Sequence, residues 1–325
     1  MRQRIMVGDK MEVNKISLQS HRSFSRGITA CIGYFDGLHL GHQSLIKEVV
    51  SSAAKNHTIP ALITFDPDPW VVLRGMHDPV HLTSMQDRVK IASQMGIEQF
   101  LILDFTKEMA ALDIDAFHAL LTRNGVKKLV CGHDFHYGQY GSGNAQTLLS
   151  QHEFEVAIIE PVTYDDVRIS STRIEQLIQD GDVATSAILL GRYYFLRGIV
   201  ERGFRRGTTM HFPTANLLLK DHYLLPKKGV YAGIVSVHNQ RYEAMINVGD
   251  NPTFANHKIT IEANLFDFDE KIYDEPITFY FVKFIRDEKR FENREELIWQ
   301  LKSDKEHIRQ LFDEHPMWKE ESLCV

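Results

Sequence analysis

The densest group of reactive residue types near the N-terminus is a ten-residue string, GYFDGLHLGH, which runs from Gly33 to His42. A strand is expected to end at Gly33 and a helix to begin after Gly41, so glycine amides and a helix N-terminus would face one ligand there. That combination favours binding of a triphosphate, with His39 and His42 as further donors. The alternatives are a tight turn with two incidental histidines, or a zinc site, for which the string supplies no third ligand.

A second group of candidate residues lies in the C-terminal half, where the sequence from Gly203 to Asn216 reads GFRRGTTMHFPTAN. The glycine-flanked basic loop, which includes Arg206 and Gly207, could wrap phosphate groups. The oxygen atoms of Thr214 and Asn216 are of the kind that Mg²⁺ prefers as ligands. The alternative is a hairpin that carries a surface pair of arginines, and the string alone does not decide between the two.

Three further strings follow in order: NVGDNPTF from Asn247, IEANLFDF from Ile261, and FIRDE from Phe284, with Phe291 close behind. Glu262 lies in the second string. A carboxylate near a metal-bound phosphate is what transfer of a phosphoryl group to an alcohol requires. The alternative is a solvated glutamate on the outer face of a strand, which its alternation with Ile261 permits.

The first half of the chain has the pattern of a parallel sheet with crossover helices. Short runs rich in Ile, Leu and Val alternate with amphipathic stretches, as expected for strands that are covered on both faces. The expected strands are 28–33, 61–65, 100–103, 128–131 and 156–159. Apolar residues at helical spacing predict helices around 45–53, 89–95 and 116–121, and residues 170–190 predict two helices that break at Gly181 and Asp182.

The second half has a different pattern, which predicts a small antiparallel β-barrel followed by a charged helix at 294–315. Its alternating strands, separated by segments rich in Gly, Pro, Asn and Asp, are expected at 195–201, 231–238, 243–247, 260–267 and 278–284. A domain boundary is expected just after residue 188, which gives one domain over 12–188 and another over 189–325.

Composition narrows the classes of function. The chain has 325 residues, enough for two domains, and its net charge of −6 argues against a broad nucleic-acid-binding surface. No apolar run approaches the length of a membrane helix, and residues 1–10 lack a signal-peptide core. The three cysteines are far apart and lack CxxC spacing, so neither a disulfide framework nor a zinc site is indicated. A cytoplasmic protein is therefore expected.

The N-terminal string resembles the nucleotidylyltransferase motif HxGH. Together with Thr64–Pro67, Gly132–Gly138 and Ile169–Arg173, it resembles the FMN adenylyltransferase module of bacterial bifunctional riboflavin kinase/FAD synthetase. The resemblance implies a Rossmann-like domain in which His39 and His42 serve catalysis. It implies ATP or phosphate binding by Gly33, Phe35, Asp36, Gly37, Ser170, Ser171, Thr172 and Arg173, and flavin binding by Asp134 and Phe135.

The C-terminal strings, in their order, resemble the riboflavin kinase module of the same family. That resemblance implies that Thr214 and Asn216 bind Mg²⁺ and the ATP phosphates, with Arg206 and Gly207 nearby. It implies that Glu262 is the general base for the ribityl 5′-hydroxyl. It also implies that Asn247, Arg286 and Phe291 lie near the flavin.

The chain departs from the family pattern at several positions. Glu175 stands where a second basic residue usually follows Arg173, and the segment 137–143 lacks the usual loop arginine. Asp68 replaces the histidine of a Pro-His-Pro string. In the kinase string, Thr208 and His211 replace an arginine and a glycine.

Three hypotheses follow. The first is a bifunctional enzyme that uses ATP and Mg²⁺ to make FMN from riboflavin and then FAD from FMN. The second is a riboflavin kinase with a degenerate adenylyltransferase module, and the third is a flavin-binding regulator without turnover. All three require small-molecule ligands, and none requires an obligate protein partner, a nucleic acid or a membrane.

Overall fold

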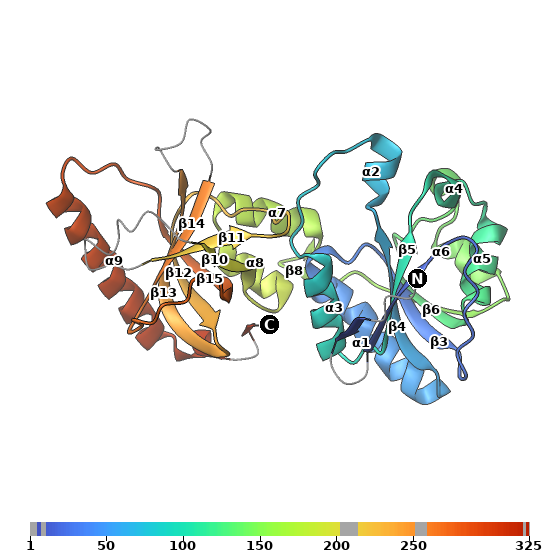
Figure 1. Ribbon diagram of the computed structural model, residues 1–325. Helices are drawn as coiled ribbons and strands as arrows, with labels where there is room; N and C mark the ends of the chain where they lie inside the picture. The colour runs from blue at the N-terminus through green and yellow to red at the C-terminus, as the bar shows by residue number, and fades with distance from the viewer. Residues whose placement is uncertain (1–4, 8–10, 202–213, 251–258, 321–322, 325) are drawn as a thin grey trace. The chain divides into compact units, whose positions relative to one another are not determined.

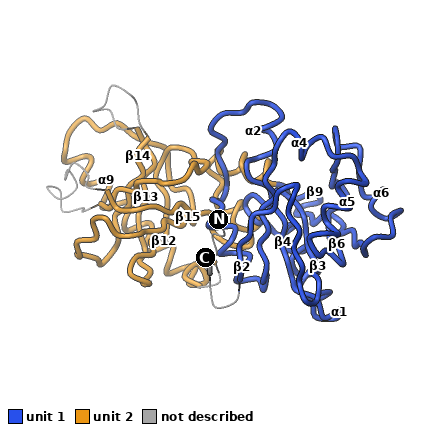
Figure 2. Tube along the Cα trace, turned by 45° about the vertical axis from the view of Figure 1, so that its right-hand side comes forward, with its two compact units in different colours: residues 1–170 blue, residues 171–325 orange. Residues whose placement is uncertain are grey.

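The computed structural model describes residues 5–7, 11–201, 214–250, 259–320 and 323–324. The chain divides into two compact units, Met1–Ser170 and Ser171–Val325, each with its own sheet (Figures 1 and 2). The boundary predicted after residue 188 separates the segments expected to carry the two activities. It is a different division from that into compact units, and it stays a prediction.

Unit 1 is a seven-stranded sheet with helices packed against it (Figure 1). The strand order is β1-β2-β5-β4-β3-β6-β7, and all neighbours are parallel except β1 and β2. The strands are β1 (Ile5–Val7), β2 (Met11–Ile16), β3 (Ile28–Ile32), β4 (Ile59–Asp66), β5 (Gln99–Asp104), β6 (Val126–Gly132) and β7 (Glu155–Ile159). A short hairpin, β8 (Thr163–Tyr164) and β9 (Val167–Arg168), follows the sheet.

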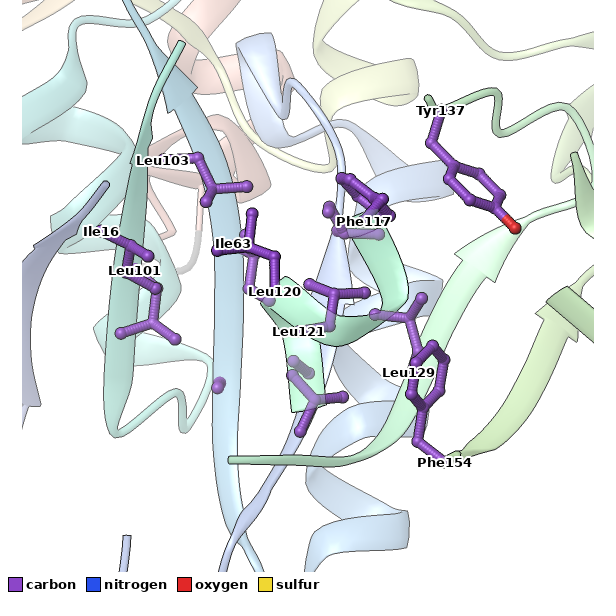
Figure 3. Close-up of a cluster of buried hydrophobic side chains, with 14 of the residues drawn as sticks. Ile16, Ile63, Leu101, Leu103, Phe117, Leu120, Leu121, Leu129, Tyr137 and Phe154 are labelled. Atoms are coloured by element: carbon purple, nitrogen blue, oxygen red, sulfur yellow. The ribbon is translucent and has the colours of Figure 1, made fainter. Parts of the chain in front are cut away.

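The helices of unit 1 are α1 (Leu40–Asn56), α2 (Pro69–Arg74), α3 (Met85–Gln94), α4 (Lys107–Ala110), α5 (Ile114–Arg123) and α6 (Ala145–Ser150). One core lies between α5 and the sheet, where Phe117, Leu120 and Leu121 pack among strand residues such as Ile63 and Leu129 (Figure 3). These strand residues recur at every second position, because alternate side chains of a strand point to the same face.

The order of the strands determines where a ligand would bind in unit 1. The chain moves outward from β3 to β4 and β5, then crosses back to place β6 on the other side of β3. In an open sheet of this type the ligand crevice lies at the carboxyl ends of the strands, where this change of direction occurs. The segments that leave β3 and β6 therefore meet at the expected ligand site.

Unit 2 is a closed antiparallel barrel of six strands in the order β10-β11-β14-β13-β12-β15. The strands are β10 (Tyr194–Glu201), β11 (Ala215–Leu219), β12 (Gly229–Val237), β13 (Gln240–Asp250), β14 (Ile259–Leu265) and β15 (Pro276–Arg286). Three helices complete the unit: α7 (Ser171–Asp180), α8 (Val183–Leu190) and α9 (Arg294–Glu314). Closure leaves no unpaired strand edge.

The predicted fold class is confirmed: a parallel sheet with helices precedes an antiparallel barrel, and helices lie at the end of the chain. The elements not predicted from the sequence are β1, β2, β8, β9, β11, α2, α4 and α6. The sequence analysis treated residues 203–216 as one loop motif, whereas β11 begins at Ala215, so Asn216 lies on a strand.

Candidate active sites

The turn that follows β3 is compact because several of its residues adopt left-handed backbone conformations. Phe35, Gly37 and Leu38 have φ values of 57°, 76° and 42°. The ring of Phe35 is fully buried and lies beneath Gly33, whose missing side chain leaves room for it. The turn therefore leads directly from the end of the strand to the N-terminus of α1, the arrangement that favours anion binding.

His39 and His42 contact each other at the start of α1. Nδ1 of His39 accepts a hydrogen bond from the backbone amide of His42 at 3.3 Å and so caps the helix. The two imidazole rings stack with centroids 3.7 Å apart. A Cβ on Gly41 would lie 3.0 Å from the His39 ring, so glycine is needed for this close approach. The structure thus brings together the two histidines that the sequence analysis selected.

The buried side chain of Asp36 connects the turn to residues 82 and 83. Its carboxylate accepts hydrogen bonds from the backbone amides of Leu82 and Thr83, both at 2.9 Å, and from the Thr83 hydroxyl at 3.0 Å. It also lies 3.2 Å from the guanidinium of Arg88, and both side chains are almost completely buried. The assignment of Asp36 to ATP binding stays a prediction, and the contacts of Asp36 within the protein hold the turn in place.

The segment that leaves β6 lies beside this turn, because β6 is hydrogen-bonded to β3. Asp134 forms an ion pair with Arg168 of β9 at 2.6 Å, and both side chains are half-exposed. Phe135 is partly buried and stacks on Tyr137 with a centroid distance of 5.7 Å. Both residues assigned to the flavin are therefore at the carboxyl end of the sheet, and Arg168 is a basic residue that the sequence analysis missed.

The loop without the family arginine has its own conformation. Gly141 adopts φ +68°, a left-handed conformation that an arginine would reach only with strain. Tyr137 and Gly143 pair across the loop, and the side chain of Tyr140 is 97% exposed. The difference from the family pattern is therefore a change in loop geometry as well as in charge.

The string Ser170–Arg173 spans the boundary between the two units. Ser170 ends unit 1, and Ser171, Thr172 and Arg173 form the first turn of α7. The carbonyl oxygen of Ile169 would lie 3.8 Å from a Cβ on Gly41, so the chain just before Ser170 runs beside the start of α1. Glu175 also lies on α7.

In unit 2, oxygen-bearing side chains of three neighbouring strands lie close to Thr214, which directly precedes β11. Glu262 on β14 is directly opposite Asn216 on β11 and directly opposite Asn247 on β13. Residues directly opposite in an antiparallel pair point to the same face. The Thr214 hydroxyl donates to the Glu262 carboxylate at 3.3 Å. The structure thus assembles hydroxyl, amide and carboxylate groups that lie up to 48 residues apart in sequence.

Oxygen ligands of this kind suit Mg²⁺, which prefers carboxylates and other hard donors. The donor set around Thr214, Asn216 and Glu262 therefore fits a magnesium-bound nucleotide. Within the described ranges, no group of three or more His, Cys, Asp or Glu side chains could hold a metal ion on its own. Arg206, Gly207, Thr208 and His211 lie outside the described residues.

Arg286 and Phe291, which the sequence analysis assigned to the flavin, have contacts within unit 2. The guanidinium of Arg286 holds Asp304 of α9, with Nε at 3.0 Å and Nη2 at 2.7 Å from Asp304 Oδ2. Phe291 lies beneath Lys289, whose Nζ is 5.6 Å from the ring centroid. Arg286 therefore anchors α9 to the barrel, and contact of Arg286 or Phe291 with a flavin stays a prediction.

Glu288 is a further acidic residue near this site. Its carboxylate packs so closely over Gly249 that a Cβ there would lie 2.2 Å from Glu288 Oε1. The same Cβ would lie 3.2 Å from the amide nitrogen of Asn247. Glu288 thus reaches the strand that carries Asn247, although the sequence analysis gave it no role.

Comparison with known proteins decides the family. Residues 21–173 match the FAD synthetase family model, and residues 190–312 match the riboflavin kinase family model. A Bacillus subtilis protein named bifunctional riboflavin kinase/FMN adenylyltransferase is 36% identical over 288 residues, which cover 86% of this chain and 91% of that protein. The chain belongs to this bifunctional family. A Listeria monocytogenes member with the same name is 35% identical over 286 residues, which cover 86% of this chain and 91% of its relative.

A solved structure extends the match to the fold. The crystal structure of a Streptococcus pneumoniae protein titled macrolide-efflux protein has a TM-score of 0.84 and 34% sequence identity. The match covers 91% of this chain and 98% of the pneumococcal chain. In the part of our chain that the structure describes, no helix has both the length and the apolar character that crossing a membrane demands.

Proposed function

We propose that this family member phosphorylates riboflavin to FMN in unit 2 and adenylylates FMN to FAD at the carboxyl edge of the sheet in unit 1. The observation that carries the first reaction is that Asn216 on β11, and Thr214 directly before it, lie beside Glu262 on β14. The second reaction rests on the stacked pair His39 and His42 at the N-terminus of α1. Membership of the bifunctional family supports both.

In the kinase reaction, the 5′-hydroxyl oxygen of riboflavin attacks the γ-phosphorus of ATP, and the bond to the β-phosphate oxygen breaks to release ADP. Glu262 takes the hydroxyl proton, since an alcohol is a poor nucleophile until a base assists it. Thr214 and Asn216 would hold Mg²⁺, which neutralises phosphate charge when it is bound. Asn247, opposite Glu262, is in position to orient the same substrate.

In the adenylyl transfer, a phosphate oxygen of FMN attacks the α-phosphorus of ATP and pyrophosphate leaves. The attacking phosphate is already ionised and needs no base, so the protein has to position both substrates and stabilise the developing charge. The amides of the turn after β3 and the imidazoles of His39 and His42 are the donors we assign to this role. Asp134 and Phe135 lie beside that turn, where they are placed to contact the flavin.

The departures from the family pattern do not remove this site. The turn, the stacked histidines and the adjoining end of β6 are intact, and Arg168 supplies a basic group beside Asp134. A kinase with an inactive N-terminal module is therefore the second candidate. The observation in its favour is that a glycine occupies position 141, where the family pattern has an arginine.

We also propose that the enzyme works in the cytoplasm, on small-molecule substrates and without an obligate protein partner. The cysteines Cys31, Cys131 and Cys324 are free and buried, as expected in a reducing compartment.

The test is to incubate the purified chain with riboflavin, Mg²⁺ and ATP and to separate the flavins by chromatography. We expect FMN first and FAD later, and FAD alone when FMN replaces riboflavin. FMN without FAD from either substrate would support the kinase-only candidate. Absence of both products would leave only flavin binding and contradict the proposal.

A further inference from the structure

Asp68 and His81 form a buried pair next to the turn after β3. Asp68 Oδ2 lies 2.8 Å from Nε2 of His81. The carboxylate is 10% exposed, whereas the imidazole keeps 21% of its surface open to solvent. Asp68 occupies the position where the family pattern has a histidine. In this chain, an imidazole from a different segment, that of His81, lies beside it.

Four hydrogen bonds join residues 82–83, directly after His81, to the turn, and one of them runs from the Thr83 hydroxyl to Asp36 at 3.0 Å. The backbone amides of Leu82 and Thr83 donate to the two carboxylate oxygens of Asp36, each at 2.9 Å. In return, the backbone amide of Gly37 donates to the Thr83 hydroxyl at 2.9 Å. His81 directly precedes these residues, so its backbone has a defined position relative to the phosphate-binding turn.

Tyr34, within the turn, connects the two partners. Its ring lies 6.2 Å from the His81 ring, and its phenol is close enough to Asp68 to lower the pKa of that carboxyl group. The guanidinium of Arg88 lies over the same ring at 4.7 Å and donates to the Tyr34 carbonyl oxygen at 3.2 Å. These contacts join the pair to the backbone that would face a phosphate.

The negative charge of Asp68 is compensated within this cluster. Burial tends to raise the pKa of its carboxyl group, but hydrogen bonds from His81 and Tyr34, together with the charges of His81 and Arg88, lower that pKa overall. Burial also raises the pKa of the Tyr34 phenol, which therefore stays protonated and able to donate. The carboxyl group of Asp68 thus has compensating groups nearby, and it does not act as an isolated charge against a substrate phosphate.

We propose that His81, oriented by Asp68, is a substrate-binding residue that donates to a phosphate group of ATP or FMN at the edge of the adenylyl-transfer site. Since Nε2 of His81 faces the Asp68 carboxylate, Nδ1 is the ring nitrogen left to contact a second partner, and it donates when it carries a proton. The proposal rests on the proposed adenylyl transfer. It explains how the chain retains an imidazole there although position 68 is an aspartate.

The kinetic test compares His81→Ala with the wild-type enzyme in the reaction from FMN and ATP to FAD. Loss of one charge-assisted hydrogen bond should raise the KM of one substrate about tenfold or more. A rise for ATP assigns the contact to the triphosphate, and a rise for FMN assigns it to the flavin phosphate. FMN formation from riboflavin should be unchanged. His77→Ala, an exposed histidine of the same loop, is the matched control and should leave both KM values unaltered.

Exchanging the two residues tests whether the pair binds substrate or only stabilises the fold. In Asp68→His with His81→Asp, an imidazole again lies beside a carboxylate, and we expect at least half of the KM increase seen in His81→Ala to be reversed. If instead His81→Ala lowers the thermal midpoint with no change in either KM, the pair is only structural and the proposal is wrong.

A binding measurement keeps the proposal testable even if the wild-type chain makes no FAD. The imidazole signals of ¹⁵N-histidine-labelled protein are recorded by NMR, and the His81 signal is identified by its absence from His81→Gln. We expect that signal to shift on addition of ATP or of FMN. If it shifts with neither ligand while other histidine signals respond, the assignment is overturned independently of turnover.

Discussion

Asp36 lies within the string that is expected to bind phosphate, and its contacts hold the turn of that string in place. Its oxygens are engaged by the amides of Leu82 and Thr83 and by the Thr83 hydroxyl, and Arg88 supplies the opposite charge in a nearly solvent-free environment. An acidic residue that faced a triphosphate directly would repel it. At this position the charge instead holds the 82–88 segment against the turn.

This arrangement predicts the effect of Asp36→Asn. The substitution leaves Arg88 buried without its counter-charge, which should lower the free energy of unfolding by roughly 3–5 kcal/mol. Urea unfolding of the chain measures this loss, and Asp78→Asn, an exposed position in the preceding loop, is the control. Unchanged stability combined with much weaker ATP binding would show that Asp36 contacts the nucleotide instead.

Glu262 is the residue that we propose as the general base of the kinase reaction. In Glu262→Gln, a neutral amide of similar shape cannot accept the proton of the 5′-hydroxyl, so FMN formation should fall by about 10²-fold or more. Riboflavin should still bind, and FAD formation from supplied FMN should continue. The exposed Glu270→Gln is the matched control in the same unit. A normal rate in Glu262→Gln would exclude it as the base.

The stacked histidines give the complementary prediction. His39→Ala with His42→Ala removes two donors from the turn and the cap of α1, so FAD formation from FMN should fall by at least about 10²-fold. FMN formation from riboflavin, measured in the same preparation, should be unaffected. The exposed pair His77→Ala with His152→Ala controls for the loss of two histidines. A large loss of kinase activity would show that the two sites are coupled.

At the scale of elements, β11 and α9 show how strands and helices build a site from distant segments. β11 brings Asn216 opposite Glu262, and α9 is fixed to the barrel through Asp304. Asp304 is 4% exposed, and it also accepts a hydrogen bond from Gln300 at 2.8 Å. A buried carboxylate with a bidentate arginine holds the helix at one position along its length.

Removing the arginine should therefore destabilise unit 2. In Arg286→Ala, Asp304 remains buried without its cation, and the free energy of unfolding should fall by roughly 3–5 kcal/mol. Arg309→Ala removes an exposed ion pair between α9 and Asp267. This substitution should lower the free energy of unfolding by at most about 1 kcal/mol. Denaturant titration of the two variants compares them directly. Equal effects would mean that the burial of Asp304 does not govern the contribution of Arg286.

Hydrophobic periodicity was sufficient to predict most elements. The strands that became β3 to β7 in unit 1, the helix pair broken at Gly181 and the long helix α9 all follow patterns within single segments. β11 was missed because its first residues belong to a string that looked like a phosphate loop. α2 was missed because six residues that begin at Pro69 contain too few turns to show a period.

The candidate sites were harder to predict than the fold. His39 with His42, and Thr214 with Glu262, could be selected from residue type and resemblance. The pairs Arg286–Asp304, Asp36–Arg88 and Asp68–His81 could not, because each joins separate segments through side chains that carry no local signal. The contacts of Asp36 and Arg286 therefore support structural roles that their sequence context did not indicate.

At the scale of the whole molecule, the chain combines two architectures whose binding sites arise differently. In unit 1, a ligand crevice is expected where the chain changes direction between β3 and β6, at the carboxyl ends of the strands. In unit 2, the site is a row of facing side chains across β11, β14 and β13 of the barrel. Each unit has its own core, so each reaction can be altered without unfolding the other unit.

The measurement that tests the two-reaction account most directly is the stoichiometry of the phosphate products. With riboflavin, Mg²⁺ and excess ATP, the account predicts one ADP and one pyrophosphate for each FAD formed. With FMN in place of riboflavin, it predicts one pyrophosphate for each FAD and no ADP. ADP without pyrophosphate, even after FMN has accumulated, would contradict the claim that this chain carries out both reactions.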